Sequence, residues 1–495
     1  MTAPNGMVAA GDPRSAQVGA QTLRLGGNAV DAAISSVMAS WVSEPLLTGP
    51  GAGGYMLVAG AGQEPTLLDF FVAAPGIGRP DDGHEPLKPF EVSFGDAVQL
   101  FNCGASSVGV PGLPAGLDAA ARRWGTVALA ELAAPASAMA RDGVPLNFEQ
   151  AYVFEILVGM LTSTPEARAE FTRDGVPLRV GEPFRSPELA ETIERLGAEG
   201  SRPFYDGDIA SAIVEQVQAG GGLLGHADLQ AYEAIEREPA RSTYRGLGVL
   251  TNPPPSAGGL LLTLAFELLE ADGPEPPATA RLVEVMEQVQ ALRTPEFTAQ
   301  LAEPGFMERF LAANLGSTTH VSVVDRDGLA CSVTCTNGEG SGLVVPGTGI
   351  HLNNIMGEED LSPSGFFTSP PGLRMPSMMA PTVVAGADGE VRLAVGSAGS
   401  NRIRSAILQV VVNALARGMG SEAAVDAPRV HVEGGVLYCE PGVDLDGLVR
   451  DDLEIVRFRA ENLFFGGAQL VERDPATGSC SGAGDPRRGG AAVAA

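Results

Sequence analysis

The sequence predicts a globular protein of the α/β or α+β class. Strand-like apolar runs alternate with helical ones through most of the 495 residues. Hydrophobic residues make up 44% of the chain, which is enough for a sizeable core. The 64 glycines and 37 prolines, about a fifth of the residues, indicate a loop-rich globular fold rather than a low-complexity or disordered chain.

Individual elements can be placed along the chain. Residues 28–41 carry apolar side chains at helical spacing behind a candidate cap at Asn28, which predicts a buried amphipathic helix. The glycine-rich run 49–54 follows this helix and precedes an apolar strand. That order is the reverse of a dinucleotide-binding loop, so the run indicates a tight turn. Further helices are expected around 117–124 and 260–269, and a linker-like stretch at 271–277 comes after the second of them.

The charge balance excludes several classes of partner. Sixty acidic residues against 32 basic ones give a net charge of −28. A surface this acidic repels phosphate backbones and anionic lipid, so neither nucleic acid nor a membrane surface is an expected partner. No stretch approaches the roughly 20 apolar residues of a membrane span. The N-terminus shows no secretory signal, so a cytoplasmic location is expected.

The cysteines and histidines do not predict a metal site. There are five of each, scattered along the chain without Cys-x-x-Cys or metal-ligand spacing. An odd number of widely spaced cysteines also argues against a disulfide framework. The G-x-S-x-G and phosphate-loop motifs are missing from the sequence. We therefore expect neither a metal nor a cofactor.

Residues 317–342 predict a β-hairpin whose two faces differ chemically. Two β-rich runs flank the short loop 326–328, whose glycine can take a left-handed conformation. If Asp325 faces Leu329, the apolar face pairs Val321 with Val333 and Val323 with Cys331. The polar face then pairs Ser322 with Ser332, His320 with Thr334 and Thr318 with Thr336. A slip of one residue would mix the two faces, so this register is expected. The pattern alone favours an ordinary hairpin whose polar face meets solvent.

Residues 381–415 predict a second unit. A strand, an Asp-Gly turn at 388–389, another strand and a small-residue loop lead into a helix with one apolar face. A loop of this kind at a helix N-terminus points backbone N–H groups at an anion or a developing oxyanion. Taken alone, the simpler interpretation is a plain helix start capped by Ser400 or Asn401.

Segments spread over nearly the whole chain resemble the γ-glutamyltranspeptidase family of N-terminal-nucleophile hydrolases. They are GGNAVDAA (26–33), the glycine run before YMLV (53–58), SVGVPG (107–112), YEAIEREPARSTYRG (232–246), PPPSAGG (253–259), TTHVSVVD (318–325), GTGIHLNN (347–354), GSAGSNR (396–402) and GAGDPRRGGAA (482–492). Together these segments are highly specific, although no single one is.

The resemblance implies an α+β protein with a four-layer αββα fold. It also implies a precursor that cuts itself at the Ser317–Thr318 bond, with the large segment 1–317 and the small segment 318–495 remaining associated as one unit. The released α-amine of Thr318 would have an ordinary pKa of ~7.7–8.0, so it can act as the base near neutral pH.

The resemblance further implies the catalytic residues. Thr318 matches the nucleophile, and Thr336 matches the threonine that hydrogen-bonds it. The backbone N–H groups of Gly399 and Ser400 match the donors that hold the oxyanion. His320 is expected to have a structural role, because an N-terminal threonine needs no histidine.

The substrate-binding residues depart from the family pattern. Asn337, Glu358 and Ser377 match its substrate-binding positions. The arginine that binds the substrate carboxylate after an Asp-Phe pair is Phe71 here, which cannot form a bidentate pair with a carboxylate. Ile355 and Met378 replace two further polar residues. These changes suggest a reduced or altered specificity for the glutamyl group.

Three functions are consistent with these residues. The first is a self-processing acyltransferase or hydrolase that cleaves small γ-glutamyl amides such as glutathione and passes the acyl group to water, an amino acid or a peptide. The second is a β-lactam side-chain acylase of the same family, favoured by the missing arginine. The third is an unprocessed, non-catalytic binding scaffold.

Overall fold

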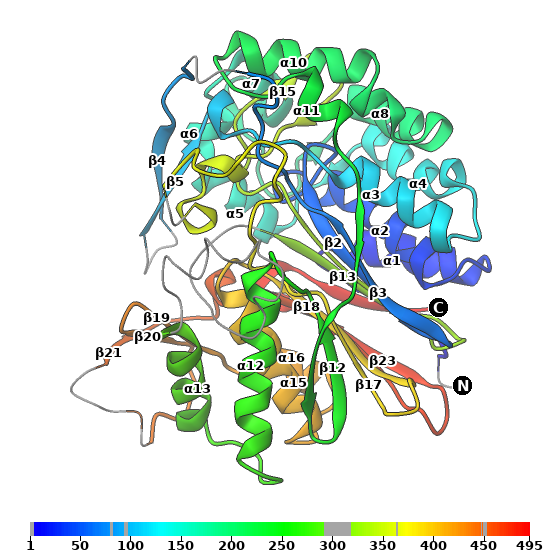
Figure 1. The fold of residues 1–495 in the computed structure, drawn as a ribbon, viewed down its shortest axis with the longest axis vertical. Helices are drawn as coiled ribbons and strands as arrows, with labels where there is room; N and C mark the ends of the chain where they lie inside the picture. Colours follow the sequence, from blue (N-terminus) through cyan, green and yellow to red (C-terminus); the bar gives the residue numbers. More distant parts are fainter. Residues whose placement is uncertain are drawn as a thin grey trace.

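Two antiparallel β-sheets packed face to face form the centre of the molecule, and helices cover both outer faces (Figure 1). The computed structural model describes residues 4–79, 83–93, 98–291, 318–362, 365–446, 448 and 453–495. The α+β class and the four-layer αββα arrangement are therefore confirmed. The predicted cleavage residue Ser317 lies outside the described residues.

The first sheet has seven strands. In spatial order these are β10 (Ile235–Arg237), β3 (Gln63–Phe70), β2 (Gly53–Gly60), β14 (Ala330–Thr336), β13 (Thr319–Val324), β1 (Met7–Ala10) and β24 (Ala491–Ala494). The second sheet has six strands. They are β11 (Ala240–Tyr244), β12 (Leu247–Thr251), β17 (Thr382–Ala385), β18 (Val391–Ala398), β22 (Gly467–Arg473) and β23 (Cys480–Gly484).

Helices form the two outer layers. The first sheet is covered by a group that includes α1 (Pro13–Arg24), α2 (Ala29–Ser43), α3 (Leu113–Trp124), α4 (Leu129–Asp142), α8 (Pro187–Glu199) and α10 (Asp208–Ala219). Shorter helices on this side are α5 (Phe148–Ile156), α6 (Val158–Leu161), α7 (Pro165–Phe171), α9 (Arg202–Tyr205) and α11 (His226–Gln230). The second sheet is covered by α12 (Ala257–Ala271), α13 (Thr279–Ala291), α15 (Arg402–Leu415) and α16 (Ser421–Asp426).

Five smaller β-sheets lie outside the two central sheets among the described residues. A three-stranded sheet beside α15 consists of β19 (Val430–Glu433), β20 (Val436–Cys439) and β21 (Glu454–Arg457). The two-stranded pairs are β4 (Lys88–Ser93) with β5 (Val98–Cys103), β6 (Val144–Pro145) with β9 (Pro183–Phe184), β7 (Thr172–Arg173) with β8 (Val176–Pro177), and β15 (Val344–Val345) with β16 (Ile350–His351).

The predicted segments 1–317 and 318–495 are interleaved rather than separate. Strand β1 of the first lies between β13 and β24 of the second, with Met7 opposite both Val324 and Ala494. The second sheet likewise combines strands from both segments. This interleaving is consistent with one αββα unit that both segments build together.

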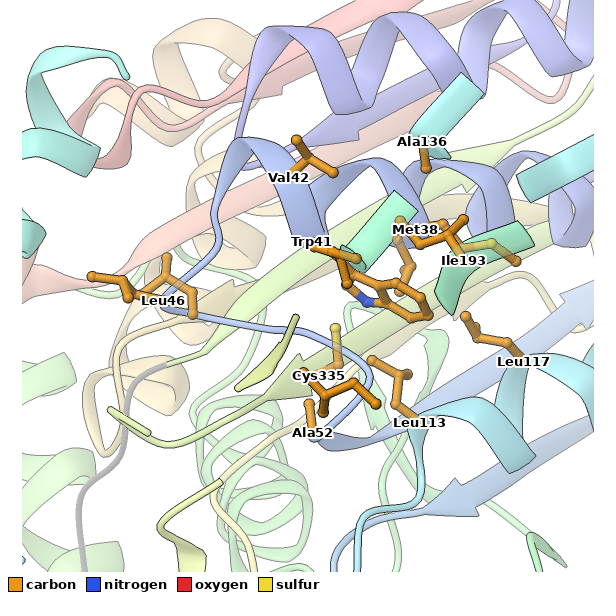
Figure 2. Close-up of a cluster of buried hydrophobic side chains, with 14 of the residues drawn as sticks. Met38, Trp41, Val42, Leu46, Ala52, Leu113, Leu117, Ala136, Ile193 and Cys335 are labelled. Carbon is orange, nitrogen blue, oxygen red and sulfur yellow. The ribbon is translucent and has the colours of Figure 1, made fainter. Parts of the chain in front are cut away.

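Helix α2 begins where the sequence predicted. The side-chain oxygen of Asn28 accepts the N–H groups of Val30 and Asp31, and the Asp31 carboxylate accepts the Asn28 N–H in return, which completes a capping box. Every residue of α2 is buried. Figure 2 shows why: Trp41 packs among side chains from α3, α4 and α8, with Cys335 of β14 beneath it.

The hairpin of β13 and β14 has the predicted register. Val321 pairs with Val333, Val323 with Cys331, Ser322 with Ser332 and His320 with Thr334. The apolar face packs under the helices around Trp41. The expectation that the polar face meets solvent is wrong, because Ser322, Ser332 and Thr334 are fully buried against the second sheet. Alternation along a strand separates the two faces, but it does not reveal that a second sheet covers the polar one.

Candidate active site

Thr318 lies at the open end of the hairpin's polar face. It is buried, with 2% of its surface exposed, and directly precedes β13. The ladder pairs Thr319 with Cys335, so the next position brings Thr318 opposite Thr336. Thr336 in turn pairs with Gly53 of β2, and its hydroxyl accepts the Gly338 N–H at 2.8 Å. The predicted pairing of the two threonines therefore has a geometric basis.

His320 ties the hairpin together behind Thr318. Its Nδ1 lies 2.7 Å from the Thr334 hydroxyl and its Nε2 lies 2.9 Å from the Ser322 hydroxyl. Ser322 also donates to the backbone carbonyl of Gln469 in β22, which joins the two sheets. Burial lowers the pKa of His320 to about 3, so its imidazole is neutral near pH 7. This arrangement agrees with a structural role.

The turn before α15 has the conformation of an anion-binding loop. Gly399 and Ser400 both have positive φ, +104° and +66°. Asn401 occupies the N-cap position of the helix, but no side chain makes a capping hydrogen bond there, so the simpler interpretation of a plain capped start is wrong. The Ser400 hydroxyl is buried and has no hydrogen-bond partner among the described residues. The turn can thus present N–H groups, and one hydroxyl, to a ligand.

Two charged residues that the sequence did not single out, Glu44 and Arg488, lie between this turn and strand β13. The Thr319 hydroxyl donates to both carboxyl oxygens of Glu44, each at 3.0 Å. The guanidinium of Arg488 lies beside Gly399, where a Cβ added to the glycine would meet Nη2 at 3.0 Å. Glu44 and Glu339 both act electrostatically on Arg488. Thr318 and the turn at 399 thus flank one buried charge cluster.

Burial shifts the pKa values in this cluster. It raises the pKa of Glu44 to about 8, and the nearby Asp12 adds to the effect. It lowers the pKa of Arg488 to about 10, with Arg402 acting in the same direction. Perturbed titratable groups of this kind are typical of functional sites. The sequence could have indicated Glu44 as a candidate site residue, because this charged residue closely follows a segment that is predicted to be a buried helix.

Asn337 and Glu358 lie at the loop that follows Thr336 at the end of β14. The Asn337 side chain donates to the His351 carbonyl at 3.1 Å, and its buried Oδ1 has no donor among the described residues. Glu358 is buried, and its Oε1 lies 2.5 Å from where a Cβ on Gly338 would stand. These two predicted substrate-binding residues therefore border the same loop, which follows β14.

Ser377 lies in an apolar part of the site. Its hydroxyl accepts the Met379 N–H at 3.0 Å and lies beside the hydroxyl of Tyr55. The Tyr55 ring stacks on Phe71 with centroids 5.4 Å apart, and both rings are fully buried. Ile355, Met375 and Met378 belong to the same buried apolar cluster. The replacements noted in the sequence, Phe71, Ile355 and Met378, are thus all buried in this large apolar cluster.

Arg237 and Arg374, the two arginines that interact electrostatically with Tyr55, both form ion pairs with Asp69. Asp69 is fully buried and forms ion pairs with Arg237 at 2.7 Å and with Arg374 at 3.4 Å. The Arg374 guanidinium also lies over the Tyr232 ring, 4.1 Å from its centroid. A substrate carboxylate would therefore have to compete with Asp69 for either arginine.

The described residues contain no group of three or more His, Cys, Asp or Glu side chains arranged to hold a metal ion. Likewise, none of their helices combines the length and apolar character needed to cross a membrane.

Comparisons with known proteins identify the family of this chain. Residues 15–314 and 304–495 match the family model described as gamma-glutamyltranspeptidase. A glutathione hydrolase proenzyme of Bacillus subtilis (strain 168) is 31% identical over 99% of this chain and 91% of its own. The Acylase ACY 1 proenzyme of Pseudomonas sp. (strain SE83) is 32% identical over 88% of this chain and 84% of its own.

A solved structure has a similar fold over the whole chain. The cephalosporin acylase from Bacillus halodurans superposes with a TM-score of 0.85 at 28% identity, over 100% of this chain and 96% of the other. Matches of this extent cover both sheets, both helical layers and the hairpin that begins at Thr318. The chain therefore belongs to the γ-glutamyltranspeptidase family of N-terminal-nucleophile hydrolases.

Proposed function

We propose that this chain is a self-processing threonine amidohydrolase and acyltransferase. The Thr318 hydroxyl attacks the Ser317 carbonyl, the acyl group moves from nitrogen to oxygen, and water hydrolyses the ester to free the α-amine of Thr318. That amine then accepts the hydroxyl proton when Thr318 attacks a substrate amide. The observation that carries the proposal is the pairing register, which brings Thr318 opposite Thr336 at the end of a buried polar face.

The remaining groups have roles that follow from their positions. The N–H groups of Gly399 and Ser400 stabilise the tetrahedral oxyanion, an interaction for which each donor typically contributes about 3–4 kcal/mol. The amine leaves with a proton returned by the α-ammonium group, and the acyl-enzyme passes to water, an amino acid or a peptide. Neither step requires a metal or a cofactor.

The first candidate donor is a γ-glutamyl amide such as glutathione. This donor is supported by the family and by relatives named glutathione hydrolase proenzymes. Asn337, Glu358 and Ser377 would bind its glutamyl group. The reaction would cleave the γ-amide bond and release the remainder of the donor as an amine.

The second candidate is an acylase that removes the side chain of a β-lactam amide. One observation favours it: Phe71 and Tyr55 form a buried aromatic pair where the glutamyl carboxylate would need a free cation. The arginines nearby are paired with Asp69. An acyl group without a carboxylate avoids that unmet charge.

Mass spectrometry and turnover of the Thr318→Ala variant test the nucleophile. We expect the wild type to yield two fragments, with Thr318 as a new N-terminus, and the variant to remain one chain without amidase activity. Thr243→Ala, an exposed threonine of β11, is the matched control and should process normally. Processing and turnover in Thr318→Ala would refute the proposal, and a wild type that stays intact and inactive would favour a binding scaffold.

Donor specificity separates the two candidates. The assay measures hydrolysis rates for three amides of one chromogenic amine. The γ-glutamyl donor carries both an α-carboxylate and an α-amine, the glutaryl donor carries only the carboxylate, and the valeryl donor carries neither. The acylase candidate predicts that valeryl is at least as good as the others. Phe71→Arg should then raise kcat/KM for both carboxylate donors relative to valeryl by about tenfold or more. Selective turnover of the γ-glutamyl donor by the wild type would reject the acylase.

A further inference from the structure

Side chains on one face of α15 form hydrogen bonds with strand β19. The Gln409 side chain exchanges two hydrogen bonds with the backbone of Val430, each at 2.9 Å. One turn earlier, the Ser405 hydroxyl lies 2.8 Å from Nδ1 of His431. Residues four apart share a helix face, so these contacts line up along the helix toward its N-terminus.

The row of contacts ends at the turn before the helix. Asn401, one further turn back, donates from Nδ2 to Oε1 of Glu433. The other carboxyl oxygen of Glu433 lies 3.3 Å from Nε2 of His431. Burial lowers the pKa of His431, so the neutral ring can donate to Glu433 while it accepts from Ser405. Glu433 therefore closes a chain of polar contacts that starts and ends on α15.

The chain of contacts is well shielded. The side chain of His431 is 1% exposed and that of Glu433 is 20% exposed. The charged and titratable groups that act on these two residues include Arg402 and Arg404 of α15 and Tyr438 of β20. With arginines on the facing helix, the Glu433 carboxylate is held electrostatically as well as by Asn401.

The turn itself needs such a restraint. Ser400 directly precedes Asn401 and has a φ of +66°, a conformation that costs a non-glycine residue about 1 kcal/mol or more. The Asn401 side chain does not cap its own helix. The bond to Glu433 holds the Asn401 side chain away from a capping conformation, which would turn the N–H groups of Gly399 and Ser400 away from the site.

We propose that Glu433 is a positioning residue that holds the oxyanion turn in its active geometry through Asn401. This inference rests on the proposed function, because it assumes that the turn at 399–400 stabilises an acyl-transfer transition state. In this proposal Glu433 acts through Asn401 rather than directly on the substrate or on Thr318. Its removal should therefore lower kcat and leave the KM of the donor nearly unchanged.

Steady-state kinetics of purified, processed enzyme test the proposal. Glu433→Ala should lower kcat about 10- to 100-fold, since a displacement near 1 Å at a reacting centre can cost about 100-fold. Glu433→Gln keeps the shape and one acceptor, and should recover kcat to within about threefold of the wild type. Glu454→Ala, an exposed carboxylate on β21 of the same small sheet, should behave as the wild type.

A second variant keeps the test decisive if Glu433→Ala fails to fold. Asn401→Ala removes the other end of the same contact and should lower kcat to a similar degree, and the double variant should lose little more than either single one. A wild-type kcat in either single variant, or a loss of thermal stability without a loss of kcat, overturns the inference. A wild type that turns over no amide would instead refute the proposed function.

Discussion

The close approach of the two sheets depends on Gly396 of β18. A Cβ added to Gly396 would stand well inside the van der Waals contact distance of the His320 ring. That ring cannot retreat, because it is fully buried and bonded to Thr334 and Ser322. Gly396→Ala must therefore push the hairpin that carries Thr318 away from the second sheet.

The expected effect has two parts. Overpacking of a tightly packed core typically costs about 1–3 kcal/mol, and here it falls on a contact between two sheets. Thr318 lies two residues from His320, and Gly399 lies three from Gly396, so the displacement separates Thr318 from the turn at 399–400, the proposed nucleophile from its proposed oxyanion donors. A separation near 1 Å lowers turnover about 100-fold. Processing at Ser317–Thr318 should slow as well.

Gly248→Ala provides the matched control. Gly248 lies in β12 of the same sheet, where an added Cβ would meet only a carbonyl oxygen at 3.7 Å. Differential scanning calorimetry and amidase assays on both variants give the comparison. Equal melting temperatures and equal kcat for the two variants would refute the idea that the sheet contact at Gly396 sets the position of Thr318.

Three further predictions concern charge and metal. The pKa of Glu44 in the folded protein, about 8, exceeds its ordinary value of 4.5. Its stabilising contribution is therefore complete below pH 4.5 and is lost as the pH rises through about 8. Urea unfolding at about pH 5 and about pH 8.5 should show the wild type losing about 4 kcal/mol relative to Glu44→Gln, and parallel pH profiles would contradict this. Asp69→Asn leaves Arg237 and Arg374 without their carboxylate and should cost about 3–5 kcal/mol of stability, which an unchanged melting temperature would exclude. Dialysis against a chelator should leave turnover unchanged, and restoration of lost activity by a metal would show the opposite.

The sequence by itself determined the parts of this protein that depend on local periodicity. The alternation of polar and apolar residues set the register of the hairpin, since a slip of one position would have exposed the valines. The Asn28 cap and the apolar spacing after it set the start of α2. Motifs spread over the chain predicted the family, and with it Thr318, Thr336 and the turn at 399 as candidate site residues.

Only the tertiary structure decided what these elements face. Strand periodicity cannot show that the second sheet covers the polar face of the hairpin, where the Ser322 hydroxyl donates to the Gln469 carbonyl of β22. Nor can it show that Glu44 meets Thr319, 275 positions further along the chain, or that Asn401 meets Glu433 from a separate small sheet. Such contacts arise when distant segments pack together. The burial that shifts their pKa values is therefore a property of the assembled layers and not of any local pattern.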